Sequence, residues 1–275
     1  AMDGTFDDCQ ARLKDLFADR GFADEVGLAG VNSINWARVL AQVVYYVTAA
    51  VSLGAPHRAV SFTVPTGNFG DIYAGLIAKR LGVPVERLVV ATNQNDILHR
   101  TLATGEQRKA GVRPSISPSM DIEVSSNFER ALFDAHGGDA AAVRADMSAL
   151  REEGGFRVGQ GALSALRDWF ASGRASEEET AAAIARTLRG TGELVCPHTA
   201  VGLHVAEGFL GAVPMVTLAT AHPAKFPDAV ERAVGMRPAL PARVGDLFGR
   251  EESFAEIAGD YAATRDYVLG HAGNA

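Results

Sequence analysis

The residues that could do chemistry are concentrated in one glycine-bearing segment, Val64-Pro65-Thr66-Gly67-Asn68-Phe69-Gly70-Asp71. It follows an apolar, strand-like run from Arg58 to Val64 and precedes a helix-like run from Ile72 to Leu81. At Gly67 and Gly70 the missing Cβ allows a positive φ and a close approach to a ligand, so successive N–H groups could point at one anion near a helix N-terminus. The spacing is neither GxGxxG nor that of a P-loop, and an ordinary βα turn is the alternative.

Polar residues also follow two other apolar runs. Thr92-Asn93-Gln94-Asn95-Asp96 comes after Arg87 to Ala91, and Thr220-Ala221-His222-Pro223-Ala224-Lys225 comes after Val213 to Ala219. In open α/β sheets the ligand crevice lies outside the carboxyl ends of the strands, so we expect both segments to converge with Pro65 to Asp71 on one site. The alternatives are local: Asn93 and Asn95 as turn formers, Thr220 as a strand-end hydroxyl bonded to backbone, and His222 as a half-buried histidine.

The elements that must position these residues are strands and helices in alternation. Ala59 to Val64 and Arg87 to Ala91 are strand-like and are separated by the helix after Gly70, which makes a βαβ unit and implies a parallel sheet. Val213 to Ala219 is a continuous apolar run, typical of a strand buried on both faces. The sequence therefore predicts an α/β fold.

Helical periodicity accounts for much of the remaining chain. Phe6 to Phe17 shows it, with Gly21 as a stop signal, and the apolar stretch Val39 to Leu53 predicts a buried helix. Phe128 to Arg189 is rich in Ala, Leu, Arg and Glu at helical spacing. Within it, Ser176-Glu177-Glu178-Glu179 has the pattern of a capping box, in which two side chains satisfy each other's free backbone N–H groups.

The composition argues against several classes of protein. The 275 residues carry a net charge of −7, and Lys and Arg are dispersed, so we expect no nucleic acid partner. Val39 to Leu53 is shorter than the ~20 residues that cross a bilayer. Cys9 and Cys196 form no paired spacing, and His198 and His204 are six residues apart, on different faces of a helix, so we expect no metal site. A reducing cytoplasm fits this composition best.

Six segments, in this order and spacing, resemble those of the threonine synthases. They are Asn32-Ser33-Ile34-Asn35-Trp36-Ala37-Arg38, Pro65-Thr66-Gly67-Asn68-Phe69-Gly70-Asp71, Ala91-Thr92-Asn93-Gln94-Asn95-Asp96, Ser126-Asn127-Phe128-Glu129-Arg130, Pro197-His198-Thr199-Ala200-Val201-Gly202 and Thr220-Ala221-His222-Pro223-Ala224-Lys225-Phe226. The resemblance spans nearly the whole chain. It implies the type II fold of pyridoxal-phosphate enzymes: a parallel twisted sheet flanked by helices, with a helical insertion. We expect an α/β lobe over residues 1–100 and 196–275, and the insertion over residues 101–195.

The resemblance implies a reaction and a site. The reaction converts O-phospho-L-homoserine and water to L-threonine and phosphate, in a monomer or homodimer, with pyridoxal 5'-phosphate as an electron sink. The implied cofactor-binding residues are Gly67, Asn68, Phe69 and Gly70, which hold its phosphate through backbone N–H groups, Asp71, and Thr220, at its pyridine nitrogen. The implied substrate-binding residues are Ser33, Asn35 and Arg38, at the substrate phosphate, and His198 and Thr199.

The substrate-binding residues have other readings. Ser33 and Asn35 could be a helix N-cap and its neighbour, and Arg38 could be a surface charge on the helix. In favour of the functional reading, a guanidinium binds phosphate through two N–H groups, and Arg38 lies just over one helical turn after Ser33.

One part of the family pattern is missing from this sequence. Threonine synthases form a Schiff base with the cofactor through a lysine in a Phe-Lys-Asp segment of an N-terminal region, and the four lysines here, Lys14, Lys79, Lys109 and Lys225, lie in no such segment. We expect the chain to be the C-terminal part of a threonine synthase, with no catalytic residue of its own for that step, and to be inactive alone. The alternatives are another type II lyase, such as a serine or threonine dehydratase, and a non-catalytic paralogue without the lysine.

Overall fold

The chain folds into two compact units. The computed structural model describes residues 1–4, 6–30 and 33–272. The larger unit spans Asn32–Leu240, and the smaller one combines Ala1–Val31 with Pro241–Ala275. Asn32, which begins the first of the family-like segments, lies outside the described residues. The expected divisions after residues 100 and 195 stay a prediction.

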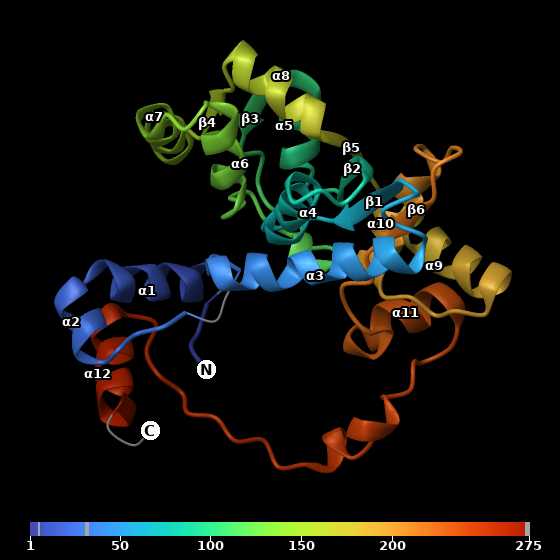
Figure 1. The fold of residues 1–275 in the computed structure, drawn as a ribbon. Helices are drawn as coiled ribbons and strands as arrows, with labels where there is room; N and C mark the ends of the chain where they lie inside the picture. Colours follow the sequence, from blue (N-terminus) through green and yellow to red (C-terminus); the bar gives the residue numbers. More distant parts are fainter. Residues whose placement is uncertain (5, 31–32, 273–275) are drawn as a thin grey trace. The chain divides into compact units, whose positions relative to one another are not determined.

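A four-stranded parallel sheet forms the centre of the larger unit (Figure 1). The strands lie in the order β5 (Phe170–Arg174), β2 (Val85–Thr92), β1 (Val60–Pro65) and β6 (Met215–Thr217). Each neighbouring pair is parallel, and α4 (Gly70–Arg80) connects β1 to β2, so the predicted βαβ unit is confirmed. The strand expected over Val213 to Ala219 is shorter and only half-buried, because it lies at the end of this order.

Successive residues of the central strands point to opposite faces of the sheet, and helices cover both faces. Val60, Phe62 and Val64 of β1 pack with α3 (Trp36–Ser52) and α4 in the largest apolar cluster. Val89 and Ala91 of β2 point the other way, into a cluster with α10 (Pro197–Glu207). Burial on both faces explains why these strands read as continuous apolar runs.

Helices make up most of the rest of the larger unit. They are α5 (Ile97–Thr104), α6 (Phe128–Ala135), α7 (Ala140–Glu152), α8 (Gln160–Trp169), α9 (Glu177–Thr191) and α11 (Pro227–Val234). The capping box predicted at Ser176 and Glu179 begins α9. An antiparallel pair, β3 (Glu106–Arg108) with β4 (Gly155–Arg157), and the sheet strand β5 lie in the stretch predicted to be mostly helical. Strands of three to five residues between helices leave little period-2 signal, so the sequence did not reveal them.

The helix predicted over Val39 to Leu53 exists, but the prediction that it is buried is correct for only one of its sides. Val39, Val43, Tyr46 and Ala50 are buried on one side of α3. Another side exposes large apolar residues: Trp36, Leu40, Val44, Tyr45, Val47 and Val51, with Leu40 at 52% and Val44 at 55%. Apolar composition alone does not distinguish a helix buried all round from one that packs by a single face.

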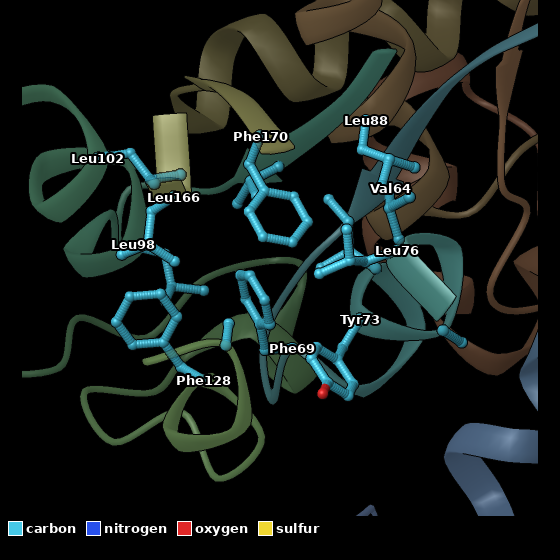
Figure 2. Packing of buried hydrophobic residues seen from close by; sticks show 14 of the residues in the cluster. Val64, Phe69, Tyr73, Leu76, Leu88, Leu98, Leu102, Phe128, Leu166 and Phe170 are labelled. Carbon is cyan, nitrogen blue, oxygen red and sulfur yellow. The ribbon is translucent and has the colours of Figure 1, made fainter. Parts of the chain in front are cut away.

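Phe69 anchors the glycine-bearing segment in the core. Its ring lies between Phe128 and Phe170, with ring centroids 5.1 and 5.2 Å away and edge-to-face angles of 70° and 77° (Figure 2). Phe69 is buried, and Leu98, Leu166 and the strand residues complete the same apolar cluster. The loop that precedes α4 is therefore fixed by a large side chain, not only by its glycines.

The smaller unit is helical. It contains α1 (Phe6–Ala18), α2 (Arg20–Glu25), α12 (Tyr261–Ala272) and two short 3₁₀ turns, Ala242–Val244 and Leu247–Gly249. Tyr261 of α12 donates a hydrogen bond to Asp19, which caps α2. Gly21, read from the sequence as a stop signal, lies inside α2, because the chain restarts a helix after Asp19.

Membrane-spanning helices and metal sites can be assessed for the described residues alone. Within residues 1–4, 6–30 and 33–272, no helix combines the length and the apolar character needed to span a bilayer. The same residues contain no group of three or more His, Cys, Asp or Glu side chains arranged to bind a metal ion.

Candidate functional site

A pocket of about 550 Å³ lies at the carboxyl ends of β1 and β6. Its wall combines the start of α3, the glycine loop with the first turn of α4, a turn after β3, and the end of β6. The lining residues are Ser33, Arg38, Gln42, Tyr45, Pro65, Thr66, Gly67, Asn68, Phe69, Gly70, Asp71, Ile72, Ser119, Leu218, Ala219 and Thr220. The structure thus brings eight of the eleven predicted site residues to one pocket: Ser33, Arg38, Gly67, Asn68, Phe69, Gly70, Asp71 and Thr220.

The backbone of the glycine loop differs from the expectation. The positive φ belongs to Phe69, at 65°, and not to Gly67 or Gly70. Close packing requires a glycine at position 67 instead, because a Cβ there would lie 2.6 Å from the carbonyl oxygen of Ser119, and it leaves little room at position 70. A Cβ on Gly70 would lie 3.2 Å from the Asn127 amide nitrogen. The buried ring of Phe69 offsets the cost of its left-handed conformation.

The loop delivers a free helix N-terminus to the pocket. Phe69 is the N-cap of α4, and its apolar side chain makes no capping hydrogen bond to the first turn. The first N–H groups of a helix have no partner within it, and the helix dipole adds a partial positive charge there. Gly70, Asp71 and Ile72 begin α4 and line the pocket. The arrangement is suited to bind an anion such as a phosphate group.

Arg38 contributes a full positive charge to the same pocket. It is exposed in the first turn of α3, and among the described residues its guanidinium has neither an ion pair nor a hydrogen bond. Ser33 lines the pocket beside it. Asn35 does not line the pocket: it is the N-cap of α3, where its Oδ1 accepts the N–H of Ala37 at 2.9 Å. The capping alternative for Asn35 therefore holds, while Arg38 is free to bind a ligand.

Asp71 places a carboxyl group with a raised pKa in the lining of this pocket. Tyr46 of α3 donates its hydroxyl to the Asp71 carbonyl oxygen at 2.8 Å and approaches Oδ1 at 3.3 Å. Burial raises the pKa of the Asp71 carboxyl from 3.8 to about 6, although the hydrogen bond from Tyr46 acts in the opposite direction. Near pH 6 this group therefore exchanges a proton in the wall of the pocket.

Ser119 belongs to the pocket but was not predicted. It lies in a 3₁₀ turn, Pro118–Met120, that a cluster of polar side chains holds in place. The Asn93 amide nitrogen lies 2.8 Å from Asp121 Oδ1 and 2.9 Å from Ser117 Oγ. Asp121 also accepts the hydroxyl of Ser115 at 2.6 Å and the amide of Asn95 at 2.8 Å. No local pattern marks Ser119, because only tertiary folding brings this turn to Gly67.

The three expected strand ends therefore have different roles. The ends of β1 and β6 form the pocket, but Thr92 to Asp96, after β2, does not line it. That segment supports the pocket indirectly, through Asn93 and Asn95. The expectation that all three converge on one site is wrong for the third, because the side-chain amides of Asn93 and Asn95 are hydrogen-bonded to Ser117 and Asp121.

His198 and Thr199 lie behind the pocket and not in its lining. Both are buried at the start of α10. Thr199 lies 3.2 Å from the sulfur of Cys196, which caps the helix. His198 Nε2 accepts the N–H of Ser119 at 3.1 Å. His198 is therefore linked to the pocket through Ser119, which lines it.

The hydrogen-bond donors that line the pocket suit a ligand with an anionic group and a polar ring. The pocket offers backbone N–H groups at a helix N-terminus, a free guanidinium and the Ser33 and Thr220 hydroxyls, with apolar Ile72 and Leu218 beside them. No lysine lines the pocket: Lys79, Lys109 and Lys225 are elsewhere in the larger unit, and Lys14 is in α1. The phosphate end of pyridoxal phosphate therefore has a counterpart here, and its lysine partner does not.

Comparisons with known proteins match this chain to threonine synthases. Residues 199–268 match the sequence model described as "Threonine synthase, C-terminal". Threonine synthase of Pseudomonas aeruginosa is 51% identical over 274 residues, which are 98% of this chain and 58% of that protein. The crystal structure of pyridoxal-phosphate-bound threonine synthase from Brucella melitensis matches 99% of this chain and 59% of its own, at 56% identity and a TM-score of 0.91. Yeast threonine synthase matches 99% and 58%, at 35% identity and a TM-score of 0.84.

These matches identify the fold class of the chain. The chain is similar to threonine synthases along almost its whole length, and its fold is the α/β type II fold of pyridoxal-phosphate enzymes. The chain spans a little under three fifths of the length of each of these relatives.

Proposed function

Because 98% of the chain is similar to a threonine synthase at 51% identity, we propose that it forms the phosphate-binding part of the active site of such an enzyme. The reaction is the conversion of O-phospho-L-homoserine and water to L-threonine and phosphate, with pyridoxal 5'-phosphate as cofactor. The observation that carries the proposal is a single pocket that contains a helix N-terminus without a side-chain cap from its N-cap residue and a guanidinium without an ion pair among the described residues. Two phosphate groups, one of the cofactor and one of the substrate, require two such anion-binding features.

On the cofactor side, the chain binds and orients. When bound, pyridoxal phosphate serves as an electron sink for the substrate's reacting carbons. The N–H groups of the loop from Gly67 to Gly70 and the first turn of α4 hold its phosphate. The Thr220 hydroxyl, which has no hydrogen-bond partner in the described part of the chain, is free to meet the pyridine nitrogen. A neutral hydroxyl favours protonation of that nitrogen less than a carboxylate would.

On the substrate side, Arg38 binds the phosphate that leaves. A guanidinium donates two parallel N–H groups to phosphate oxygens and stabilises the negative charge that grows on the leaving group. Ser33 adds a hydroxyl donor beside it. Asn35, His198 and Thr199 support these groups from behind, by capping α3 and by packing at the start of α10.

The chain contains no lysine positioned to link the cofactor, so we propose that it does not catalyse the reaction alone. A chimera supplies the missing part: the Pseudomonas threonine synthase keeps the rest of its own sequence and takes this chain in place of the matching 58%. We expect the chimera to release phosphate from O-phospho-L-homoserine. It should not act on serine or threonine, which carry no phosphate for Arg38 to bind.

Two substitutions in the chimera assign the two phosphates. Arg38→Ala should lower kcat/KM for O-phospho-L-homoserine by roughly 1.5–3 kcal/mol, the range for a lost charge-assisted hydrogen bond, with cofactor affinity unchanged. Arg38→Lys is the matched control, because it keeps the charge and loses the two-pronged geometry. Thr220→Ala should change the cofactor spectrum and leave the preference for a phosphorylated substrate intact.

Three results would contradict the proposal. One is a chimera that deaminates serine or threonine without releasing phosphate, which would favour a dehydratase. Another is a folded chimera that binds cofactor and turns over neither substrate, which would favour a non-catalytic paralogue. The third is loss of cofactor from Arg38→Ala, which would move Arg38 to the cofactor side. A cytoplasmic location and a monomeric or homodimeric state are part of the same proposal.

A further inference from the structure

His198 is a buried histidine with one satisfied and one unsatisfied nitrogen. Only 4% of the residue is exposed. Nε2 accepts the N–H of Ser119 at 3.1 Å, and Nδ1 is shielded from solvent without a partner among the described residues. A neutral imidazole donates from one nitrogen and accepts at the other, so the Nε2 contact assigns the ring proton to Nδ1.

The N–H of Ser119 needs an acceptor from outside its own turn. Ser119 is the second residue of the 3₁₀ turn Pro118–Met120, and the first N–H groups of a helical turn have no partner within it. His198 supplies that acceptor. On the other side of the same residue, the Ser119 carbonyl oxygen packs so closely on Gly67 that a Cβ there would lie 2.6 Å away. The imidazole thus contacts Ser119, and Ser119 in turn contacts the glycine loop.

The ring of His198 also contacts the segment that follows Thr220. Its centroid lies 4.6 Å from that of Phe226, with the planes tilted by 46°. Phe226 follows the short turn Pro223–Lys225, where His222 Nδ1 accepts the N–H of Ala224 at 3.1 Å. One side chain therefore touches both the turn and the segment that bring Ser119 and Thr220 to the pocket.

We propose that His198 is a positioning residue that holds the Ser119 turn against Gly67, and so keeps the glycine loop in the shape that binds phosphate. The inference rests on the proposed phosphate-binding role of this pocket. It differs from direct substrate binding, because His198 does not line the pocket.

The charges around the ring support this role. Burial lowers the pKa of His198 from 6.5 to about 4, and the positive charge of Lys225 acts in the same direction, while the carboxylate of Asp121 opposes both. Nε2 therefore keeps its lone pair at neutral pH and accepts from Ser119 without interruption.

Two substitutions of His198 distinguish the effect of its hydrogen-bond acceptor from the effect of its aromatic ring. His198→Phe keeps an aromatic ring against Phe226 and removes the acceptor. His198→Gln removes the ring and keeps an oxygen that can accept the Ser119 N–H. His204→Phe is the matched control, since His204 lies on the same helix, also has an Nδ1 without a partner in the described residues, and does not line the pocket.

The measurement is a titration of the 275-residue chain with inorganic phosphate, followed by the amide resonances of Gly67 to Gly70, together with hydrogen exchange of the Ser119 amide. We expect His198→Phe to weaken phosphate binding roughly tenfold and to speed Ser119 exchange, because a backbone N–H loses its acceptor. His198→Gln should stay within about threefold of the wild type, the effect expected of a weaker but retained hydrogen bond. His204→Phe should change neither quantity.

The possible failures are distinguishable. If the wild type itself ignores phosphate at Gly67 to Gly70, the proposed function of the pocket fails. If the wild type binds and His198→Phe binds equally well, or if both His198 variants lose binding equally, only the positioning role is overturned. If His198→Phe does not fold, the test is the tautomer of the wild-type His198 imidazole, measured by its ¹⁵N chemical shifts. We expect Nδ1 to carry the proton and Nε2 to carry none from pH 5 to 8. A proton on Nε2 would overturn the inference.

Discussion

Asp71, in the lining of the pocket, and His198, behind it, have pKa values shifted in opposite directions. Asp71 has a carboxyl pKa raised from 3.8 to about 6, and His198 has an imidazole pKa lowered from 6.5 to about 4. Burial is the first cause of both shifts, because it disfavours the charged form of either group. Each shift makes the free energy of unfolding depend on pH, and the pH ranges over which the two groups act overlap.

We expect the two contributions to oppose each other between about pH 4 and pH 6. Folded Asp71 holds its proton more tightly than the unfolded chain does, so its contribution to stability is present below pH 3.8 and is lost as pH rises through about 6. His198 does the reverse: its contribution is present above pH 6.5 and is lost as pH falls through about 4. By linkage each amounts to about 3 kcal/mol at most.

Substitution should therefore reveal slopes that the wild type masks. Asp71→Asn should make the free energy of unfolding rise more steeply with pH between 4 and 6.5, and should increase it at pH 7 by about 1–3 kcal/mol. His198→Gln should make it rise less steeply. Urea unfolding at pH 4.5, 5.5 and 7 measures both. Parallel pH profiles for the wild type and Asp71→Asn would show that the carboxyl is not buried as described.

Phe69 links the core to the binding loop, and its removal should affect both. Phe69→Ala deletes a buried ring between Phe128 and Phe170 while keeping the unfavourable positive φ. We expect a loss of about 3–5 kcal/mol in the free energy of unfolding, the usual range for a buried phenylalanine, and weaker binding of phosphate at the loop. Denaturant unfolding and a phosphate titration test this. A loss below about 1 kcal/mol would show that the ring does not anchor the loop.

At the scale of elements, the sequence predicted which helices and strands exist, and in which order, better than it predicted which faces are buried. The βαβ unit around Gly70 and the capping box at Ser176 were readable, because a continuous apolar run, a 3.6-residue period and a four-residue pattern are local. Strands β4 and β5 were not, since they are short and lie between helices. The two-sided nature of α3 was missed because nearly all of its residues are apolar, so no polar face marks the exposed side.

A pair of neighbouring valines tests the orientation of α3. Val43 is 6% exposed and packs in the main apolar cluster, whereas Val44 is 55% exposed. Val43→Ala should reduce the free energy of unfolding by about 1–3 kcal/mol, from lost burial and the cavity left behind. Val44→Ala should change it by less than about 0.5 kcal/mol. Equal losses in denaturant unfolding would mean that α3 is covered on both sides in solution.

At the scale of the whole molecule, the site was only partly predictable. Eight of the eleven predicted residues line one pocket, because their segments end strands or begin helices at the same side of a parallel sheet. Asn35 caps a helix, and His198 and Thr199 lie behind the wall, since residue type alone does not fix which way a side chain points. Ser119 depends on a turn that folding brings from a distant part of the sequence.

The central claim is that the loop from Gly67 to Gly70 binds the phosphate of pyridoxal phosphate through backbone N–H groups. The most direct measurement compares pyridoxal phosphate with pyridoxal, which lacks the phosphate, by amide shifts of this chain. The account predicts that pyridoxal phosphate perturbs the amides of Gly67 to Ile72 saturably, that inorganic phosphate perturbs the same amides, and that pyridoxal leaves them unchanged. Equal effects of pyridoxal phosphate and pyridoxal, or no effect of either on these amides, would contradict it.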